Sequence, residues 1–314
     1  MDPRLDPDVR ALQEARAKTK PVRMADAGYQ SIRDWLEDLP HPTGLPEMAG
    51  TDTLQIPGPG GDLRLDVYTP GERPSLPAVV YFHGGGMVMG SNHSFRPTAI
   101  NIAHSSGAKV IAVDYRLAPE HPVPAQLEDC YAATEWVAAN AAELGIDHER
   151  ICVMGDSAGG TLAAGVALKA RDSGGPDLFC QVLIYPGVDA DMAAESVTEF
   201  AEGPGLTLED IRYLRGLAGE GAGVTSPYVL PILAEDLSGL PQTIVAVAEC
   251  DPVRDWGERY AARLVKARVQ TTVTRYPGLT HGFVMQVDHL ARARLAISEI
   301  GALLDAKFRH PLPW

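Results

Sequence analysis

The sequence predicts an α/β protein with a mostly parallel, eight-stranded sheet, helices on both faces of the sheet and a helical cap. Two observations predict this fold class. Short, continuous apolar runs alternate with helical patterns from residue 78 to residue 308, and such runs are typical of strands that are buried on both faces of a parallel sheet. One long interval, Pro186 to Gln242, interrupts the alternation without a strand of this type. An interval of that length usually has a function or a structure of its own.

The first 50 residues are predicted to form helices that contribute to the cap. Apolar residues recur at helical spacing in two groups, each of which gives a helix one apolar face: Val9, Leu12 and Ala15, then Ile32, Trp35 and Leu39. Two alternating segments follow, Thr51–Ile56 and Leu63–Tyr68, joined by a turn rich in glycine and proline. These segments predict a β-hairpin.

Six further strands bring the predicted total to eight. They are expected at the apolar runs Ala78–Phe82, Val110–Val113, Ile151–Met154, Val182–Tyr185, Ile244–Ala248 and Thr271–Tyr276. Helices are expected at Ala125–Ala142, Ala158–Ala170, Trp256–Ala267 and Leu290–Phe308, with a shorter one near Leu208–Leu217. The chain is therefore expected to divide into an N-terminal helical cap segment (1–50), a first part of the core (51–185), a cap insertion (186–225) and a second part of the core (226–314).

Charge and composition favour a cytoplasmic protein that acts on small molecules. The net charge is −14 and no run of lysine and arginine appears, whereas nucleic-acid binders usually carry a basic patch. The chain starts MDPRLD, without the apolar segment of a secretory signal, and no apolar run is long enough to cross a bilayer. The four cysteines lack metal-type spacing and are expected to be reduced thiols in the core: Cys130, Cys152, Cys180 and Cys250.

The segment Gly155–Gly159, with the sequence GDSAG, fits the nucleophile-elbow pattern. The tight turn from strand to helix leaves room only for small residues beside Ser157, which is held strained and exposed at the apex. A predicted strand precedes the segment and a predicted helix follows it. An ordinary strand-to-helix turn is the alternative interpretation of such a pattern.

A glycine-rich loop, His83-Gly84-Gly85-Gly86, follows directly after the predicted strand Ala78–Phe82. Three glycines allow the backbone to approach a substrate and to direct N–H groups at a developing oxyanion. A phosphate-binding loop is disfavoured because the lysine and serine or threonine of that motif are missing. His83 precedes the glycines and is expected to hold the loop rather than to act as a base.

An acid and a histidine complete the constellation. Glu249, Asp251 and Asp255 follow the predicted strand Ile244–Ala248, at the sheet edge where parallel sheets build their sites. Asp255 is expected to cap the next helix, and the role of Glu249 stays open between a side chain held by the sheet and a partner that supports the site. Asp251 lies in the loop between them, where Pro252 limits the backbone freedom, and is expected to be the catalytic acid. His281 follows the last strand, so the order serine, aspartate, histidine is that of α/β-hydrolases.

The chain resembles the hormone-sensitive-lipase-like (family IV) carboxylesterases of the α/β-hydrolase superfamily, in their GDSAGG branch. The motifs that carry the resemblance are His83–Ser91, Gly155–Gly160, the segment 114–122 (DYRLAPEHP) and the segment 236–241 (DLSGLP). The similarity extends from about Gly58 to Phe283. It implies the α/β-hydrolase fold, with the N-terminal helices and the insertion forming the family's cap.

The resemblance also implies roles for single residues. Ser157, Asp251 and His281 would form a catalytic triad. The oxyanion hole would consist of backbone N–H groups, with Gly84 shaping the loop that carries two of them: Gly85, Gly86 and Ala158. It further implies cis peptide bonds before Pro119 and Pro124. Two positions depart from the family pattern, since Met87 follows the glycines where a bulky group is common, and Arg268-Val269 stands where relatives usually turn on a glycine.

The expected function is hydrolysis of carboxylic esters with short to medium acyl chains through an acyl-enzyme intermediate. No metal ion or organic cofactor is expected. Hydrolysis of amides, carbamates or lactones by the same triad is an alternative, as is a non-catalytic small-molecule receptor on the same fold. The expected partner is a small-molecule ester, without nucleic acid or stable membrane association, and the last strand and helix are a candidate surface for a homodimer.

Overall fold

The computed structural model describes residues 2–17, 23–219 and 225–311, and its sheet contains the eight predicted strands. The strand order is β1-β2-β4-β3-β5-β6-β7-β8. The strands are β1 (Gly50–Gly58), β2 (Gly61–Thr69), β3 (Leu76–Phe82), β4 (Lys109–Val113), β5 (Ile146–Asp156), β6 (Cys180–Ile184), β7 (Gln242–Cys250) and β8 (Thr271–Thr280). β1 and β2 form the predicted antiparallel hairpin, and β2 pairs antiparallel with β4. The strands β3 and β5 to β8 run parallel to β4.

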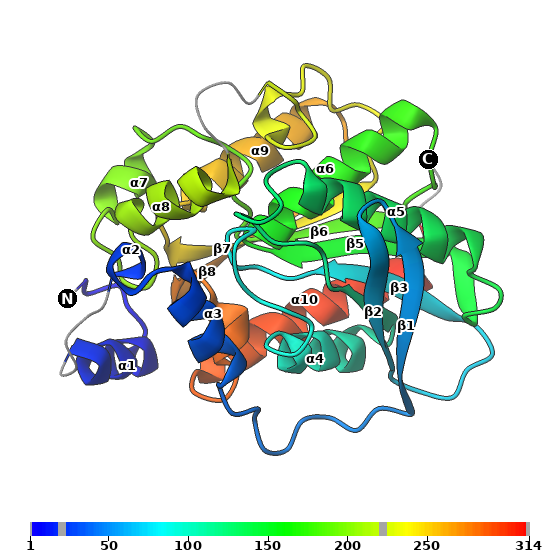
Figure 1. Ribbon diagram of the computed structural model, residues 1–314, viewed down its shortest axis with the longest axis horizontal. Helices are drawn as coiled ribbons and strands as arrows, with labels where there is room; N and C mark the ends of the chain where they lie inside the picture. Colours follow the sequence, from blue (N-terminus) through cyan, green and yellow to red (C-terminus); the bar gives the residue numbers. More distant parts are fainter. Residues whose placement is uncertain (1, 18–22, 220–224, 312–314) are drawn as a thin grey trace.

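Helices cover both faces of the sheet, as the sequence predicts. α5 (Ala125–Ala139), α6 (Ala158–Ser173) and α9 (Arg254–Lys266) lie on one face, and α4 (Arg96–Ser106) and α10 (Ala291–Arg309) lie on the other (Figure 1). Every residue of β3 is buried. Full burial of an aliphatic side chain contributes about 1.5–3 kcal/mol, so this central strand is a strong anchor for the glycine-rich loop that follows it.

Helix α4 is the main element that the sequence analysis missed. Six of its eleven residues are buried, because the helix is enclosed between the sheet and α10. Gly301 of α10 allows this close approach, since a Cβ atom at that position would overlap the side chain of Ser105. The polar residues Thr98 and Ser106 lie on its buried side, so its sequence shows little of the apolar periodicity by which amphipathic helices are recognised.

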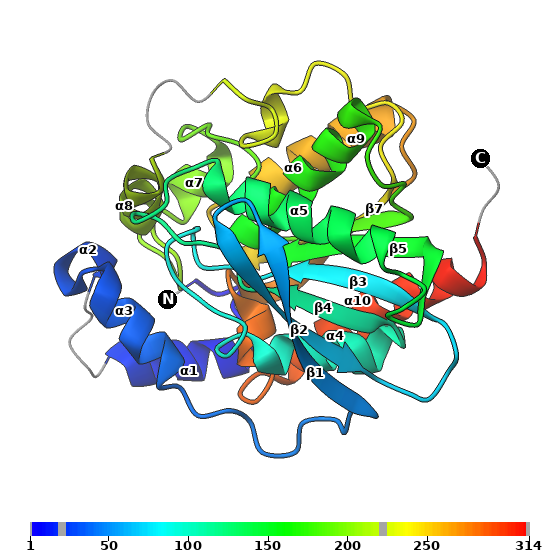
Figure 2. The same cartoon turned by 45° about the vertical axis from the view of Figure 1, so that its right-hand side comes forward.

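The two predicted cap segments meet at one end of the molecule. The N-terminal segment forms α1 (Pro7–Ala17), α2 (Met24–Ala27) and α3 (Tyr29–Glu37), and the insertion forms α7 (Glu195–Glu199) and α8 (Leu208–Ala218). α2 lies against α8 (Figures 1 and 2), and the Arg23 guanidinium pairs with the Glu209 carboxylate at 2.6 Å. Residues 1, 18–22 and 220–224 of these segments lie outside the described residues.

The predicted apolar face of the second cap helix is wrong. Trp35 and Leu39 are 57% and 37% exposed, whereas Leu36 is buried. The helix instead packs through Leu36 and, in part, through Tyr29 and Ile32. With only nine residues and several apolar positions, the spacing of the sequence alone was compatible with more than one face.

Both proline features implied by the resemblance are present: the Ala118-Pro119 and Val123-Pro124 bonds are cis, as is Gly203-Pro204.

β8 lies at one edge of the sheet, and its Val273 is 44% exposed. The homodimer expected at the last strand and helix thus has an open sheet edge available, and it stays a prediction.

Arg268 occupies the left-handed position that ends helix α9. Its φ is 63°, the Arg268 N–H donates to the Val265 carbonyl and the Val269 N–H donates to the Leu264 carbonyl. This is the Schellman pattern, in which glycine is the usual residue. The departure from the family pattern therefore keeps the same backbone turn with a residue that is strained there.

Replacing Arg268 with glycine is expected to raise the free energy of unfolding by about 0.5–1 kcal/mol, because glycine adopts a positive φ without a steric cost. The larger loss of chain entropy when glycine folds offsets part of this gain. Urea unfolding of Arg268→Gly and of the control Arg268→Ala measures the effect. Greater stability in Arg268→Ala than in Arg268→Gly would contradict the assignment of backbone strain to this turn.

Candidate active site

Ser157 sits at the apex of the turn between β5 and α6. Its backbone is strained, with φ 55° and ψ −120°. The neighbouring glycines are required by close packing: a Cβ atom on Gly155 would overlap the backbone of Gly159, and one on Gly159 would overlap the Phe82 carbonyl. The tight turn thus places the serine side chain at the carboxyl edge of the sheet, which is the geometry expected of a nucleophile elbow.

The structure brings His281 and Asp251 into line with this serine. The His281 Nε2 atom lies 2.8 Å from the Ser157 Oγ atom, and the His281 Nδ1 atom lies 2.8 Å from the Asp251 Oδ2 atom. Asp251 is fully buried just after β7, and its Oδ1 atom accepts the Val253 N–H at 2.9 Å. The ring of Tyr185 packs against the His281 ring with centroids 4.7 Å apart. This chain of hydrogen bonds can transfer a proton from the serine to the imidazole and hold the resulting cation.

The two other acids near this edge have different partners. The Glu249 carboxylate accepts the Gly278 N–H at 2.8 Å, so it supports the segment that leads to His281. The predicted capping role of Asp255 is wrong. Helix α9 begins at Arg254, which places Asp255 inside the first turn, and its carboxylate accepts the Ser196 N–H of the insertion at 2.8 Å.

The glycine-rich loop reaches the cavity at the serine, since Gly86 and Ser157 both line it. Gly85 and Gly86 have φ values of 109° and 64°, so the loop needs glycine at both positions. Ala158 is the first residue of α6, where helical N–H groups lack a partner within the helix. In the described part of the chain, no intramolecular acceptor takes a hydrogen bond from any of these three amides.

His83 holds the loop, as expected for a residue that precedes the glycines. It is buried and stacks between Phe95 and Tyr115, with ring centroids 5.2 and 4.3 Å away. The Tyr115 O–H donates to the His83 carbonyl at 2.7 Å. Burial lowers the pKa of His83 below its usual value, so the ring is held neutral.

Asp156 is a buried carboxylate that the sequence analysis did not single out. It lies directly before Ser157, is 2% exposed, and accepts hydrogen bonds from the Tyr81 and Tyr185 hydroxyls and the Gly84 N–H. Burial raises its pKa to about 6 in spite of these donors. Its place in the GDSAG motif was the available signal, but a motif position does not reveal which way a side chain points.

Asp156→Asn is expected to gain stability relative to the wild type as the pH rises. A pKa that is raised from 3.8 to about 6 means that the folded state binds this proton more tightly than the unfolded state does. The corresponding contribution, about 3 kcal/mol, is complete below pH 4 and is lost as the pH rises through 6. The Asn variant has no such loss, so its stability relative to the wild type should rise by about 2 kcal/mol from pH 4.5 to 7.5. Urea unfolding at both pH values measures the difference, and a difference independent of pH would contradict the expectation.

A small cavity opens onto the serine. Its volume is about 80 Å³. Side chains of the cap, of α9 and of the core line it: Gly86, Met87, Ser157, Ala158, Thr161, Gly187, Leu206, Ile211, Leu214, Arg215, Val253, Trp256 and His281. The lining is mostly apolar, and α8 of the insertion supplies three of its residues. The insertion therefore closes the space in which a substrate would meet Ser157.

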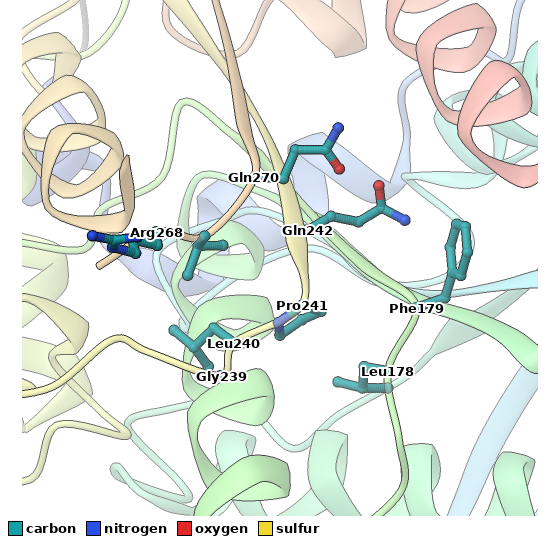
Figure 3. Close-up of a pocket in the computed structure, with 9 residues that line it drawn as sticks. Leu178, Phe179, Gly239, Leu240, Pro241, Gln242, Arg268 and Gln270 are labelled. Atoms are coloured by element: carbon teal, nitrogen blue, oxygen red, sulfur yellow. The ribbon is translucent and has the colours of Figure 1, made fainter. Parts of the chain in front are cut away.

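A larger hollow of about 450 Å³ lies at the opposite edge of the sheet. Figure 3 shows Gln242 and Gln270 beside Leu178, Phe179 and Pro241. These residues lie at or near the amino ends of β6, β7 and β8, whereas Ser157 and His281 lie at the carboxyl ends. The size of this hollow therefore has no bearing on the chemistry at the serine.

The four cysteines provide no second reactive centre. All four cysteines are buried and free, and burial raises the pKa of the Cys130 and Cys152 thiols well above the usual value and that of Cys250 to about 11. Thiols of this kind are poor nucleophiles at neutral pH. The described ranges contain no cluster of three or more potential metal ligands and no helix long and apolar enough to cross a membrane.

Known proteins resemble the chain over most of its length. The family described as "alpha/beta hydrolase fold" matches residues 79–285. Esterase LipI of Mycobacterium tuberculosis is 43% identical over 270 residues, which cover 84% of each chain. An arylesterase of Saccharolobus solfataricus is 35% identical, over 97% of this chain and 99% of its own. Among solved structures, the esterase of Pyrobaculum calidifontis superimposes with a TM-score of 0.87 at 38% identity, over 97% of this chain and 99% of its own.

Proposed function

Because the chain belongs to the α/β-hydrolase family, in its hormone-sensitive-lipase-like (family IV) branch, and is a carboxylesterase, we propose that Ser157, His281 and Asp251 are its catalytic triad and that it hydrolyses esters of short to medium acyl chains. The observation that carries this proposal is the continuous hydrogen-bond chain from Asp251 through His281 to Ser157, with both links at 2.8 Å.

The proposed reaction proceeds in two acyl-transfer steps. The Ser157 Oγ atom attacks the ester carbonyl while His281 Nε2 takes its proton, and His281 then returns the proton to the departing alcohol. Water attacks the resulting acyl-enzyme with His281 again as the base, which releases the acid and restores the serine. Asp251 holds the imidazole in the required tautomer and stabilises the imidazolium.

The negative charge that develops on the carbonyl oxygen is proposed to be stabilised by the amides of Gly85, Gly86 and Ala158. Gly86 and Ala158 line the cavity at Ser157, and none of the three amides has an acceptor among the described residues, so they are free to donate to the oxyanion. Loss of one such donor typically costs about 2.7–4 kcal/mol of transition-state stabilisation. The triad and the amides require no metal ion or organic cofactor for this chemistry.

The size of the cavity supports a preference for short chains. An engineered cavity of about 150 Å³ holds benzene, whereas the cavity beside Ser157 measures about 80 Å³. Leu206, Ile211 and Leu214 of the insertion restrict it, which supports the proposal that residues 186–225 act with the N-terminal helices as the cap. We expect no activation at lipid interfaces.

Initial rates on p-nitrophenyl esters from acetate to dodecanoate, with matched anilides, test this function. We expect the highest kcat/KM at or below about six acyl carbons and little turnover of anilides. Preferred cleavage of anilides would favour the amidase alternative. The highest activity on emulsified long-chain triacylglycerol would contradict the proposed substrate class.

Leu214→Ala is expected to shift the chain-length preference. The substitution removes three carbon atoms from the cap side of the cavity, where Leu214 contacts the substrate space beside Gly86. Each methylene that becomes buried contributes about 0.8 kcal/mol, so two more should raise the kcat/KM ratio of octanoate to butyrate about tenfold. Leu217→Ala, on the same helix but not in the cavity lining, is the control. An unchanged ratio in a folded Leu214→Ala would place the acyl chain elsewhere.

A further inference from the structure

We propose that Asp156 is a positioning residue for the oxyanion loop, in which its Oδ1 atom accepts the Gly84 N–H and thereby aims the amides of Gly85 and Gly86. The inference rests on the proposed function, because it assigns Asp156 a part in the same ester hydrolysis. Asp156 takes no part in the triad hydrogen bonds and does not line the cavity, and its bond from the Gly84 N–H links it directly to the loop.

The carboxylate joins three strands behind the serine. Its Oδ1 atom accepts the Tyr81 O–H at 2.6 Å and the Gly84 N–H at 3.0 Å. Its Oδ2 atom lies 3.3 Å from the Tyr185 O–H. Tyr81 belongs to β3, Asp156 ends β5 and Tyr185 directly follows β6, so the carboxylate is fixed by both strands that neighbour its own.

The bond to Asp156 holds the Gly84 N–H at the start of three consecutive glycines, whose backbones rotate at little steric cost. The other bonds of the loop hold different atoms. The Gly84 carbonyl lies 2.7 Å from the His83 Nδ1 atom, and the Gly85 carbonyl accepts the Val88 and Met89 N–H groups. A Cβ atom on Gly84 would lie 2.5 Å from the Asp156 Oδ2 atom, which shows how closely the loop rests on this carboxylate.

The accepting atom, rather than the negative charge, is what the loop requires. An asparagine keeps an Oδ1 atom for Tyr81 and Gly84, and its amide group can donate to the Tyr185 hydroxyl oxygen. An alanine keeps neither. The two substitutions therefore separate the positioning of Gly84 from the charge of the carboxylate.

Steady-state kinetics and boronate inhibition of Asp156→Ala and Asp156→Asn test the inference. An alkylboronic acid accepts the Ser157 Oγ atom at boron while the serine proton passes to His281, and one oxygen of the tetrahedral boronate takes the place of the oxyanion. We expect Asp156→Ala to lower kcat for p-nitrophenyl acetate about 10²-fold, as for the loss of an oxyanion donor, to weaken boronate binding by a similar factor, and to leave KM within about threefold. Asp156→Asn should restore both values to within about tenfold of the wild type.

A substitution that only loosened the fold would not produce this split between kcat and KM, nor its rescue by asparagine. Asp66→Ala, which removes a buried carboxylate from β2 away from the loop, is the matched control and should keep the wild-type kcat. If Asp156→Ala does not fold, the double variant Asp156→Ala/Tyr81→Phe, which leaves one fewer hydroxyl unpaired, should fold and show the same kcat loss.

A folded alanine variant with kcat and boronate affinity within threefold of the wild type overturns the inference, as does an asparagine variant that loses as much as alanine. Ser157→Ala, assayed beside them, distinguishes a failure of the proposed function from a failure of the role of Asp156. Retained hydrolysis in Ser157→Ala would overturn the proposed function itself. An inactive Ser157→Ala together with a fully active Asp156→Ala would overturn only the role of Asp156.

Discussion

Replacing Ser157 with alanine is expected to lower kcat for ester hydrolysis by about 10⁶-fold, as the loss of the nucleophile does in other triad hydrolases. The reason is specific to the elbow: the Oγ atom that meets His281 Nε2 at 2.8 Å is the only part of the residue that the substitution removes. The free energy of unfolding should be unchanged or slightly higher. The strained backbone is the same in both variants, and alanine has no side-chain hydroxyl to hold in one orientation.

The measurement is kcat on p-nitrophenyl acetate with circular dichroism as the test of folding. Ser238→Ala, an exposed serine in a turn remote from the site, is the matched control and should keep full activity. More than a few per cent of the wild-type kcat in a folded Ser157→Ala would remove Ser157 from the role of nucleophile.

Asp251→Asn is expected to lower kcat by about 10⁴-fold while leaving the fold intact. In the wild type the Asp251 Oδ2 atom faces His281 Nδ1 at 2.8 Å and the Oδ1 atom accepts the Val253 N–H. An asparagine that keeps its oxygen on Val253 turns its amide toward Nδ1. The imidazole then carries its proton on Nε2 and has no lone pair for the serine hydroxyl.

Two neighbouring acids provide the controls. Asp255→Asn should keep most of the activity and lose about 1–2 kcal/mol of stability, because its carboxylate bonds the Ser196 N–H of the insertion and pairs with Arg254. Glu249→Gln retains an acceptor for the Gly278 N–H and should lower activity only modestly. An active Asp251→Asn beside an inactive Asp255→Asn or Glu249→Gln would show that Asp251 is not the catalytic acid.

Much of the fold could be predicted because the central strands are buried on both faces. β3 carries no exposed residue, and such a strand stands out as an apolar run whatever its neighbours are. α4 escaped prediction because its buried side includes the polar residues Thr98 and Ser106, which weaken the apolar periodicity of its sequence. The short helix α3 shows a further limit: which of Trp35, Leu36 and Leu39 is buried depends on packing against the core, and Leu36 alone is buried.

The candidate site was predictable to the extent that its residues follow strands. Ser157, Asp251 and His281 each stand at the carboxyl end of a parallel strand, and chain order alone places them at one edge. The start of α9 at Arg254 could not be predicted to the residue, so Asp255 was misread as a cap. The contacts of Asp156 lie with Tyr81, Gly84 and Tyr185, which are distant in sequence and meet only through the pairing of β5 with β3 and β6.

The central claim is that Ser157 is the nucleophile, and peptide mass mapping after reaction with a fluorophosphonate tests it most directly. The reagent phosphonylates an activated serine with loss of fluoride, so activity and labelling should change together. We predict one adduct per chain, located on the peptide that contains Ser157, with loss of esterase activity in proportion to labelling and no adduct in Ser157→Ala. An adduct on any other residue, or full activity in a completely labelled protein, would contradict the account.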